Sequence, residues 1–355
     1  MKTIYDLRGI GPKSCGVQMV ALEYLKFILE KISSDNDIFL FNSSVKNVVD
    51  NYNINQKHRF IFTNISRFNL IDGVYLLFKF GFRYKFVSFH SSLPIFYISL
   101  HPKYFICHDL FVIDDSDFFN KYSYFKKKIA KVYFYTVLYF SFLSAKKIIV
   151  PSNYVKKSIE KKFAQFRDKI IVIHNPLGNN FYDESRNLAN KSIKTRLLYI
   201  GNLRSYKGYE DLYNQFRKLD PLKFELIVIT SDPSYKKIIG IPNIHVFYKV
   251  NDDVKFSFIE TSDLLVIPSK FEGFGLPVLE GVNRECNILI STSSSFCHFD
   301  ALKINKFDFL SNDCFVSSIN QSLNEGIEIK KYRKQIAMSI FNNNNTFNLF
   351  KNSIS

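Results

Sequence analysis

The sequence contains no tryptophan, no long apolar run and no paired cysteines. Its five cysteines are scattered without any Cys-x-x-Cys pair, at Cys15, Cys107, Cys286, Cys297 and Cys314. An odd, scattered set is typical of a reducing compartment and argues against a disulfide framework. No apolar run reaches about 18 residues, so the sequence predicts no transmembrane helix. The N-terminal residues carry charges at Asp6 and Arg8, which do not fit the pattern of a signal peptide.

The charge balance is strongly basic, because 48 Lys and Arg outnumber 32 Asp and Glu and give a formal net charge of +16. Three explanations are open: a nucleic-acid partner, an anionic membrane surface, or a codon bias toward lysine. No basic region is interleaved with a known nucleic-acid motif, so we expect no nucleic-acid partner. The apolar stretch that comes nearest to a transmembrane helix, Val132–Leu143, is too short to span a membrane and indicates a buried or interfacial helix. Peripheral contact with an anionic membrane and codon bias both remain open.

The chain of 355 residues is long enough for two domains. Short β-rich runs alternate with longer helical stretches, which predicts parallel sheets built from strand–helix–strand units. A polar, turn-rich stretch at 174–189 interrupts the alternation and is the expected linker. We therefore expect an α/β protein of two doubly wound domains facing a central cleft, residues 1–178 and 190–340, followed by an Asn-rich tail, 341–355, that frays.

The segment Ser262–Glu280, SDLLVIPSKFEGFGLPVLE, is the most informative part of the sequence. A buried strand at Leu264–Ile267 is followed by a loop with two glycines and by a helix that begins near Leu276. Ligands of open α/β sheets bind at the carboxyl ends of strands, and glycines let the backbone approach them closely. The positive end of the following helix suits a diphosphate. Glu280 lies eight residues beyond Glu272 and can reach the same cleft.

This segment resembles the Glu-x7-Glu signature of glycosyltransferase family 4, the group 1 retaining enzymes of GT-B fold. The resemblance implies that Glu272 contacts the donor sugar beside the reacting carbon and that Glu280 binds the ribose hydroxyls. It also implies that backbone groups hold the sugar and phosphates, namely those of Gly273, Phe274, Gly275 and Leu276. The alternative is a Gly-rich strand–helix turn with incidental acids. After Glu280 the chain departs from the family's usual Ala-Met-Ala-x-Gly-x-Pro-Val and reads Gly-Val-Asn-Arg-Glu-Cys-Asn-Ile.

The segment Leu198–Gly208, LYIGNLRSYKG, resembles the strand and Lys-Gly turn that open the C-terminal domain in this family. Departure of a nucleoside diphosphate builds negative charge, which fixed cations stabilise in the transition state. Lys207 is the best candidate for that cation. Arg204 is a second candidate for donor binding, with a solvent-facing position as its alternative.

Histidine follows two apolar runs in the N-terminal half. The His108–Asp109 pair resembles the histidine that faces the donor sugar in this family, and His108 is the expected catalytic residue of this domain. Asp109 either orients His108 or caps the next turn. His90 is a rival candidate, on the acceptor side.

The N-terminal segment Asp6-Leu7-Arg8 with Gly16 resembles the family's Asp-x-Arg opening and its glycine-rich loop near the donor phosphates. Gly16 is therefore a candidate donor-binding residue, with Gly9 and Gly11 as an alternative pair. Neither alternative completes a Gly-x-Gly-x-x-Gly motif.

We expect neither a metal nor another cofactor, with a nucleotide sugar as co-substrate. The acidic run 114–117 contains Asp-x-Asp, but we expect it to lie in a loop of a fold that does not use this metal motif.

The resemblance implies transfer of a hexose, with retention, from a nucleotide diphosphate sugar to a hydroxyl of a glycan or lipid-linked glycan in surface-polysaccharide synthesis. GDP-mannose is the first choice of donor, because the His-Asp-Leu and Asp-x-Arg segments look similar to mannosyltransferases. The expected location is the cytoplasm, with possible peripheral contact at the inner face of the plasma membrane. The alternative function is a non-catalytic sugar-nucleotide-binding or scaffold subunit.

Overall fold

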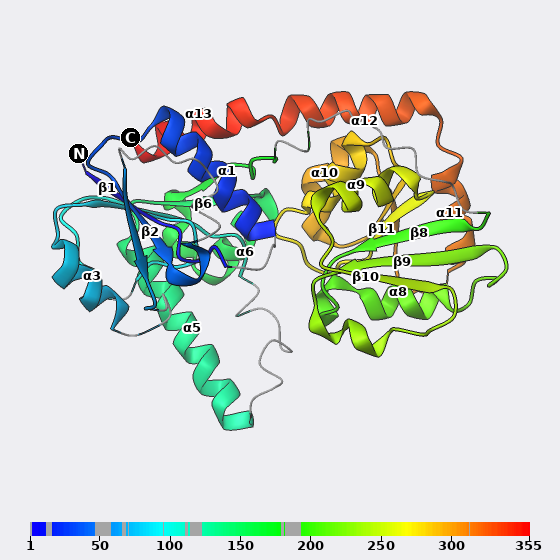
Figure 1. The fold of residues 1–355 in the computed structure, drawn as a ribbon, viewed down its shortest axis with the longest axis horizontal. Helices are drawn as coiled ribbons and strands as arrows, with labels where there is room; N and C mark the ends of the chain where they lie inside the picture. The colour runs from blue at the N-terminus through cyan, green and yellow to red at the C-terminus, as the bar shows by residue number, and fades with distance from the viewer. Residues whose placement is uncertain are drawn as a thin grey trace. The chain divides into compact units, whose positions relative to one another are not determined.

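The computed structural model divides into two compact units (Figure 1). Unit 1 comprises Met1–Pro176 with Asn343–Ser355, and unit 2 comprises Leu177–Asn342. The structure describes residues 2–11, 16–46, 58–65, 69, 71–94, 96–110, 113, 123–178, 181, 193–311 and 313–355. Most of the expected linker at 174–189 lies outside these residues.

Unit 1 contains a parallel sheet with the strand order β3-β2-β1-β4-β5-β6-β7. Its strands are β1 Thr3–Asp6, β2 Ile38–Asn42, β3 Arg59–Thr63, β4 Lys85–Ser88, β5 Lys103–Ile106, β6 Lys147–Val150 and β7 Ile170–Val172. Its α-helices are α1 Gly16–Lys31, α3 Asp72–Phe80, α5 Tyr124–Ser144, α6 Asn153–Lys162 and α13 Asn343–Ile354, and short 3-10 helices are η1 Ser43–Val45 and η2 Ala164–Lys169. The central strands are short and almost wholly buried, as expected for parallel strands covered on both faces.

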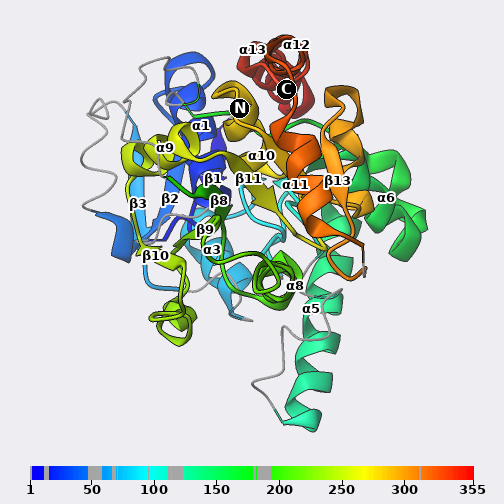
Figure 2. The same ribbon diagram turned by 90° about the vertical axis from the view of Figure 1, so that its right-hand side faces the viewer.

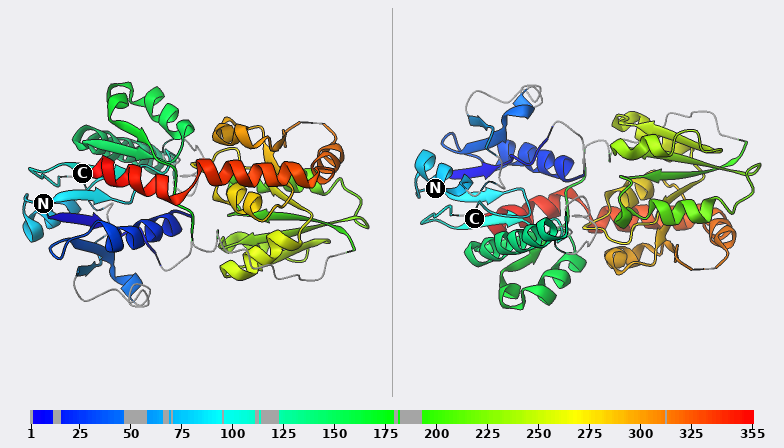
Figure 3. Two further views of the ribbon diagram at one scale, coloured as in Figure 1. Left: turned by 90° about the horizontal axis from the view of Figure 1, so that it is seen from above. Right: turned by 90° about the horizontal axis from the view of Figure 1, so that it is seen from below.

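The C-terminal residues return to unit 1 and form helix α13 (Figures 1 and 3). Phe350 is fully buried, and its ring centroid lies 4.5 Å from that of Tyr24 in α1 and 5.9 Å from that of Phe89. Lys85 Nζ donates a hydrogen bond of 2.6 Å to the carbonyl of Ile354. The prediction that residues 341–355 form a fraying tail is therefore wrong: most of this segment is helix α13 of unit 1, because its aromatic residues complete the core.

Unit 2 contains a parallel sheet with the strand order β10-β9-β8-β11-β12-β13 (Figure 2). Its strands are β8 Thr195–Ile200, β9 Phe224–Thr230, β10 Ile244–Tyr248, β11 Leu264–Ile267, β12 Ile288–Ser291 and β13 Asn305–Phe307. Its α-helices are α8 Tyr209–Phe216, α9 Asp252–Thr261, α10 Leu276–Asn283, α11 Phe315–Leu323 and α12 Ile327–Ile340, and its 3-10 helices are η3 Ser205–Lys207, η4 Pro233–Lys237 and η5 Ser294–Leu302.

Alternate residues of the unit 2 strands enter two different cores. Leu198 and Leu265 face the core formed with α9, α10 and α12, whereas Leu197 and Leu264 face the core formed with α8 and α11. This period of two buries both faces of the sheet. The structure thus confirms the predicted α/β class, with helices covering both faces of a parallel sheet.

The strand order reverses between β1 and β4 in unit 1, and between β8 and β11 in unit 2. In an open α/β sheet, the loops that follow the two strands at such a reversal diverge to opposite sides and leave a ligand-binding crevice at the carboxyl edge. A ligand site is therefore expected at the loops after these four strands.

Candidate active site

In unit 2, the loop after β8 and the loop after β11 pack closely and are hydrogen-bonded to each other at the carboxyl edge of the sheet. Gly208 has φ +70°, and a Cβ added to it would lie 2.1 Å from the carbonyl oxygen of Pro268. The amide of Lys270 donates a hydrogen bond of 2.8 Å to the carbonyl of Tyr206. Because both contacts involve backbone atoms, the two loops hold one another in a fixed arrangement.

This arrangement brings two of the expected site residues together. Lys207 Nζ lies 2.6 Å from Glu272 Oε1, although the residues are 65 positions apart in the sequence. Ser269 Oγ donates a second hydrogen bond, of 2.8 Å, to the same carboxylate oxygen. The Glu272 side chain is almost buried, whereas that of Lys207 is about one-fifth exposed. The ammonium is thus held at the carboxyl edge and remains partly accessible to solvent.

Glu280 lies in helix α10 and is also buried against a lysine. Its Oε1 accepts a hydrogen bond of 2.7 Å from Lys255 Nζ, and Lys255 also pairs at 3.0 Å with Asp252 at the start of α9. Burial alone lowers the pKa of Lys255, but Glu280 and Asp252 outweigh it and raise that pKa above its ordinary value. Lys255 is therefore charged at neutral pH. The sequence reasoning missed this residue, since only the packing of α9 against α10 shows its partner.

The turn that leads into α10 has the expected features. Gly275 has φ +88°, a left-handed conformation that glycine adopts without strain, and Pro277 occupies the first helical turn. Phe274 is buried, and its ring stacks on that of His298 with centroids 5.4 Å apart. His298 Nε2 donates a hydrogen bond of 2.6 Å to the carbonyl of Phe274. The side chain of Phe274 therefore serves packing, which leaves only its backbone for the expected donor contact.

Serines that follow β12 support the same loop. Ser291 Oγ donates to the carbonyl of Ser269 at 2.5 Å, and Ser293 Oγ donates to the carbonyl of Lys270 at 2.6 Å. The loops after β8, β11 and β12, which are neighbours in the sheet, are therefore linked by hydrogen bonds. The sequence reasoning did not identify these serines, although their clustering directly after a buried strand was a usable signal.

The segment after Glu280, where the sequence departs from the family pattern, folds into a close-packed turn. A Cβ on Gly281 would lie 2.7 Å from Leu265 Cδ2, so the glycine allows close helix–strand contact. Glu285 has φ +54° and supplies the left-handed residue that a glycine often supplies. The departure changes the turn and leaves α10 and β12 in place.

Arg204 lies at an exposed position directly before the short helix η3. Burial raises the pKa of Asp232, but hydrogen bonds from Ser234 and Leu203 and the charge of Arg204 together lower it below its ordinary value. Arg204 thus contributes charge at the surface near Asp232.

In unit 1, both candidate histidines follow neighbouring strands at the carboxyl edge. His108, after β5, is buried, and its Nε2 lies 3.3 Å from the carbonyl of Phe89 after β4. The amide of His108 donates to Ser91 Oγ at 3.3 Å. His90 Nε2 accepts a hydrogen bond of 2.7 Å from the amide of Gly9, which follows β1. The loops after β1, β4 and β5 are therefore in mutual contact.

Arg8 is buried between two carboxylates. It makes a two-point contact with Asp6, with Nε–Oδ1 and Nη2–Oδ2 distances of 2.8 Å, and it contacts Asp72 at 2.5 and 2.9 Å. Burial raises the pKa of Asp6, but the Arg8 guanidinium outweighs it and holds that pKa well below its usual range. The Asp-x-Arg segment thus forms a structural ion cluster at the β1/β4 reversal. Gly16, the remaining candidate, is the exposed first residue of α1.

In the described part of the chain, no group of three His, Cys, Asp or Glu side chains could hold a metal ion. The acidic run at 114–117 lies outside the described residues. Among the helices that the structure describes, none combines the length and apolar character needed to cross a bilayer.

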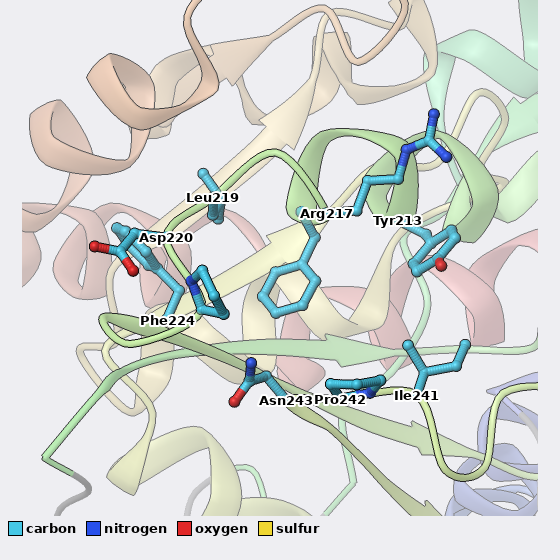
Figure 4. A pocket seen from close by; sticks show the side chains of 10 residues that line it. Tyr213, Arg217, Leu219, Asp220, Phe224, Ile241, Pro242 and Asn243 are labelled. Atoms are coloured by element: carbon cyan, nitrogen blue, oxygen red, sulfur yellow. The ribbon is translucent and has the colours of Figure 1, made fainter.

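A cavity of about 260 Å³ lies elsewhere in unit 2 (Figure 4). Its lining includes Phe224 at the start of β9 and Asn243 directly before β10, together with Tyr213 and Phe216 of α8. It therefore lies at the amino ends of these strands, opposite the edge that carries Lys207 and Glu272.

Unit 2 is similar to known proteins over most of its length. Residues 181–338 match the family described as Glycosyl transferases group 1. The chain is 25% identical over 259 residues to the O-antigen chain mannosyltransferase RfbU of Salmonella typhimurium, covering 69% of this chain and 67% of RfbU. Matches to two further curated glycosyltransferases cover only 37% and 33% of those proteins.

Two solved structures show the same fold. One is WaaG, described as a glycosyltransferase involved in lipopolysaccharide biosynthesis, with a TM-score of 0.73, 13% identity and full coverage of both chains. The other is HepE of Anabaena in complex with UDP and glucose, with a TM-score of 0.72, 11% identity, and coverage of 100% of this chain and 99% of HepE. The two Rossmann-like units thus constitute the GT-B fold of glycosyltransferases, and the family match supports a transferase.

Proposed function

We propose that this chain, whose residues 181–338 match Glycosyl transferases group 1, moves a hexose from a nucleotide diphosphate sugar to a hydroxyl of a glycan or lipid-linked glycan. The observation that carries the proposal is the Lys207–Glu272 pair at 2.6 Å, at the carboxyl edge where β8 and β11 reverse the strand order. A fixed ammonium at this edge is suited to the charge that develops on a departing diphosphate.

Each candidate residue has a proposed role. Lys207 stabilises the leaving diphosphate, and Glu272 positions Lys207 and contacts the sugar beside the reacting carbon. Glu280, held by Lys255, accepts hydrogen bonds from the ribose hydroxyls. His108 contacts the donor sugar from unit 1. The backbone from Gly273 to Leu276, together with Gly16 and Arg204, binds the remaining donor groups.

We propose retention of the anomeric configuration without a covalent sugar–enzyme intermediate. In unit 2 the two site carboxylates are each engaged by a lysine, an arrangement that suits binding better than nucleophilic attack. The departing diphosphate then accepts the proton of the acceptor hydroxyl. We also propose that no metal ion is needed, because Lys207 and backbone amides supply the positive charge. Turnover should therefore be unaffected by a chelator.

The similarity to RfbU, a mannosyltransferase of O-antigen chains, supports GDP-mannose as the first donor to test and surface-polysaccharide synthesis as the setting. HepE, whose structure contains UDP, makes UDP-sugars the second group. Thermal shifts measured over a panel of nucleotide sugars will identify the donor, because a ligand that binds only the native state raises its apparent stability. We place the reaction in the cytoplasm, at the inner face of the plasma membrane.

The proposal is tested by transfer of radiolabelled sugar to acceptor. We expect Lys207→Ala and Glu272→Ala each to abolish turnover. The matched control is Lys306→Ala, which removes a lysine from the surface pair Lys306–Asp300 of similar length, 2.7 Å. Full activity in both site variants would disprove the assignment. A non-catalytic binding subunit is distinguished by donor hydrolysis without acceptor, which a transferase performs slowly and such a subunit does not.

A further inference from the structure

Helix α5, Tyr124–Ser144, is only partly covered by the rest of unit 1. All of its residues are described, and the four buried ones, Val137, Leu138, Ser141 and Phe142, lie in its C-terminal half. The N-terminal half therefore projects from unit 1, as two perpendicular views show (Figures 1 and 2).

The solvent-facing side of α5 carries an apolar stripe. Phe125, Ile129, Val132, Phe140 and Leu143 are each at least half exposed. Their spacings of 4, 3, 8 and 3 residues place them on one face of a helix, opposite the buried residues. The stripe is about 27 Å long at the helical rise per residue. Exposed apolar side chains that gather on one face of a helix indicate a surface that contacts a partner.

Lysines flank this stripe. Lys126 lies on one side of it and Lys128 on the other, whereas Lys127 and Lys131 lie on the far side of the helix. The helix contains no Asp or Glu. The local charge is therefore of one sign and complements an anionic surface. A second copy of α5 would bring no acidic side chain to these lysines.

We propose that α5 docks unit 1 onto an anionic lipid surface. The apolar stripe enters the boundary between headgroups and acyl chains, and the flanking Lys126 and Lys128 contact the lipid phosphates. The long lysine side chains extend their ammonium groups toward the headgroups while their methylene stems line the apolar face. This contact is a property of one helix, so it is measured without donor or acceptor, and its failure would leave the proposed transferase activity unaffected.

The charge contribution is tested by co-sedimentation of the full chain with vesicles of phosphatidylcholine containing about 30% phosphatidylglycerol. We expect binding at low salt, weaker binding at high salt, and little binding to phosphatidylcholine alone. The double variant Lys126→Gln/Lys128→Gln should bind about 25-fold more weakly, since each lysine contributes about fivefold. The control Lys236→Gln/Lys237→Gln removes two exposed lysines of unit 2 and should bind as the wild type does.

The apolar contribution is tested with Phe125→Gln/Ile129→Gln, which keeps good helix formers in α5. We expect a loss of about 100-fold, since each buried side chain of this size contributes about tenfold or more. The control Leu222→Gln/Ile239→Gln alters two exposed residues of unit 2 and should bind normally. Circular dichroism verifies that the variants are folded.

Three results would overturn the proposal. The first is equal binding by the α5 variants and their controls. The second is equal binding to neutral and anionic vesicles. The third is a concentration-dependent dimer that Phe125→Gln/Ile129→Gln dissociates, in a protein that does not bind vesicles, which would identify a second copy as the occupant of the stripe.

Discussion

Replacing Gly208 with alanine tests whether backbone contact between two loops maintains the candidate site. Gly208 combines a left-handed backbone, φ +70°, with close approach to the carbonyl oxygen of Pro268, which lies 2.1 Å from the position of an added Cβ. Both obstacles involve main chain, so no side-chain rotation relieves them. Gly208 also precedes α8, and its carbonyl accepts the amide of Leu212 at 3.0 Å, which resists a shift of this residue.

The expected loss of folding stability in Gly208→Ala has two parts. An alanine in a left-handed conformation costs about 1 kcal/mol. Displacing a packed backbone to admit a methyl group costs about 1–3 kcal/mol more. Gly240→Ala is a matched control in the same unit, because Gly240 has φ +82° but no atom within 4 Å of an added Cβ. The control therefore carries the backbone cost alone.

Thermal unfolding of the full chain measures both variants. For a domain of this size, 1 kcal/mol corresponds to a shift in Tm of about 2–4 °C. We expect Gly240→Ala to lower the Tm of unit 2 by about 2–4 °C and Gly208→Ala to lower it by about 4–16 °C. Transfer activity at a temperature where both are folded should fall about 100-fold in Gly208→Ala alone, because a loop shift of about 1 Å misplaces reacting groups. Equal Tm shifts in the two variants would refute the argument that the loops are held by this contact.

Two further predictions concern unit 1. Phe350→Ala should lower the free energy of unfolding by about 3–5 kcal/mol, because the buried ring contacts Tyr24 and Phe89. The control Leu349→Ala alters an exposed neighbour and should change it by less than about 0.5 kcal/mol. Urea unfolding measures both variants, and equal effects would contradict the docking of α13. Burial lowers the pKa of His174, so the unfolded chain binds this proton more readily, and stability should fall as the pH drops below about 6.5. His174→Gln should reduce the difference in Tm between about pH 7.5 and about pH 5.5, and an unchanged difference would exclude His174 as its source.

The sequence predicted the elements of the Glu272 segment because short buried runs and amphipathic stretches leave strong local patterns. Strand β11 has the predicted bounds, Leu264–Ile267, and helix α10 begins at the predicted residue, Leu276. Helix α3 was missed because apolar residues also occupy its solvent side, as Phe78 shows by being 88% exposed. Strand β13 was missed because Asn305–Phe307 is only three residues long and partly polar.

The sequence alone determined which segments end strands and open helices, and therefore which loops lie at the carboxyl edges, since local hydrophobic period and turn chemistry are properties of neighbouring residues. It also singled out Glu272, Glu280 and Lys207. Only the tertiary structure decided which charges meet: Lys207 with Glu272, and Lys255 with Glu280. Such pairs join residues far apart in the chain, so they depend on strand order and helix packing, which no local pattern specifies.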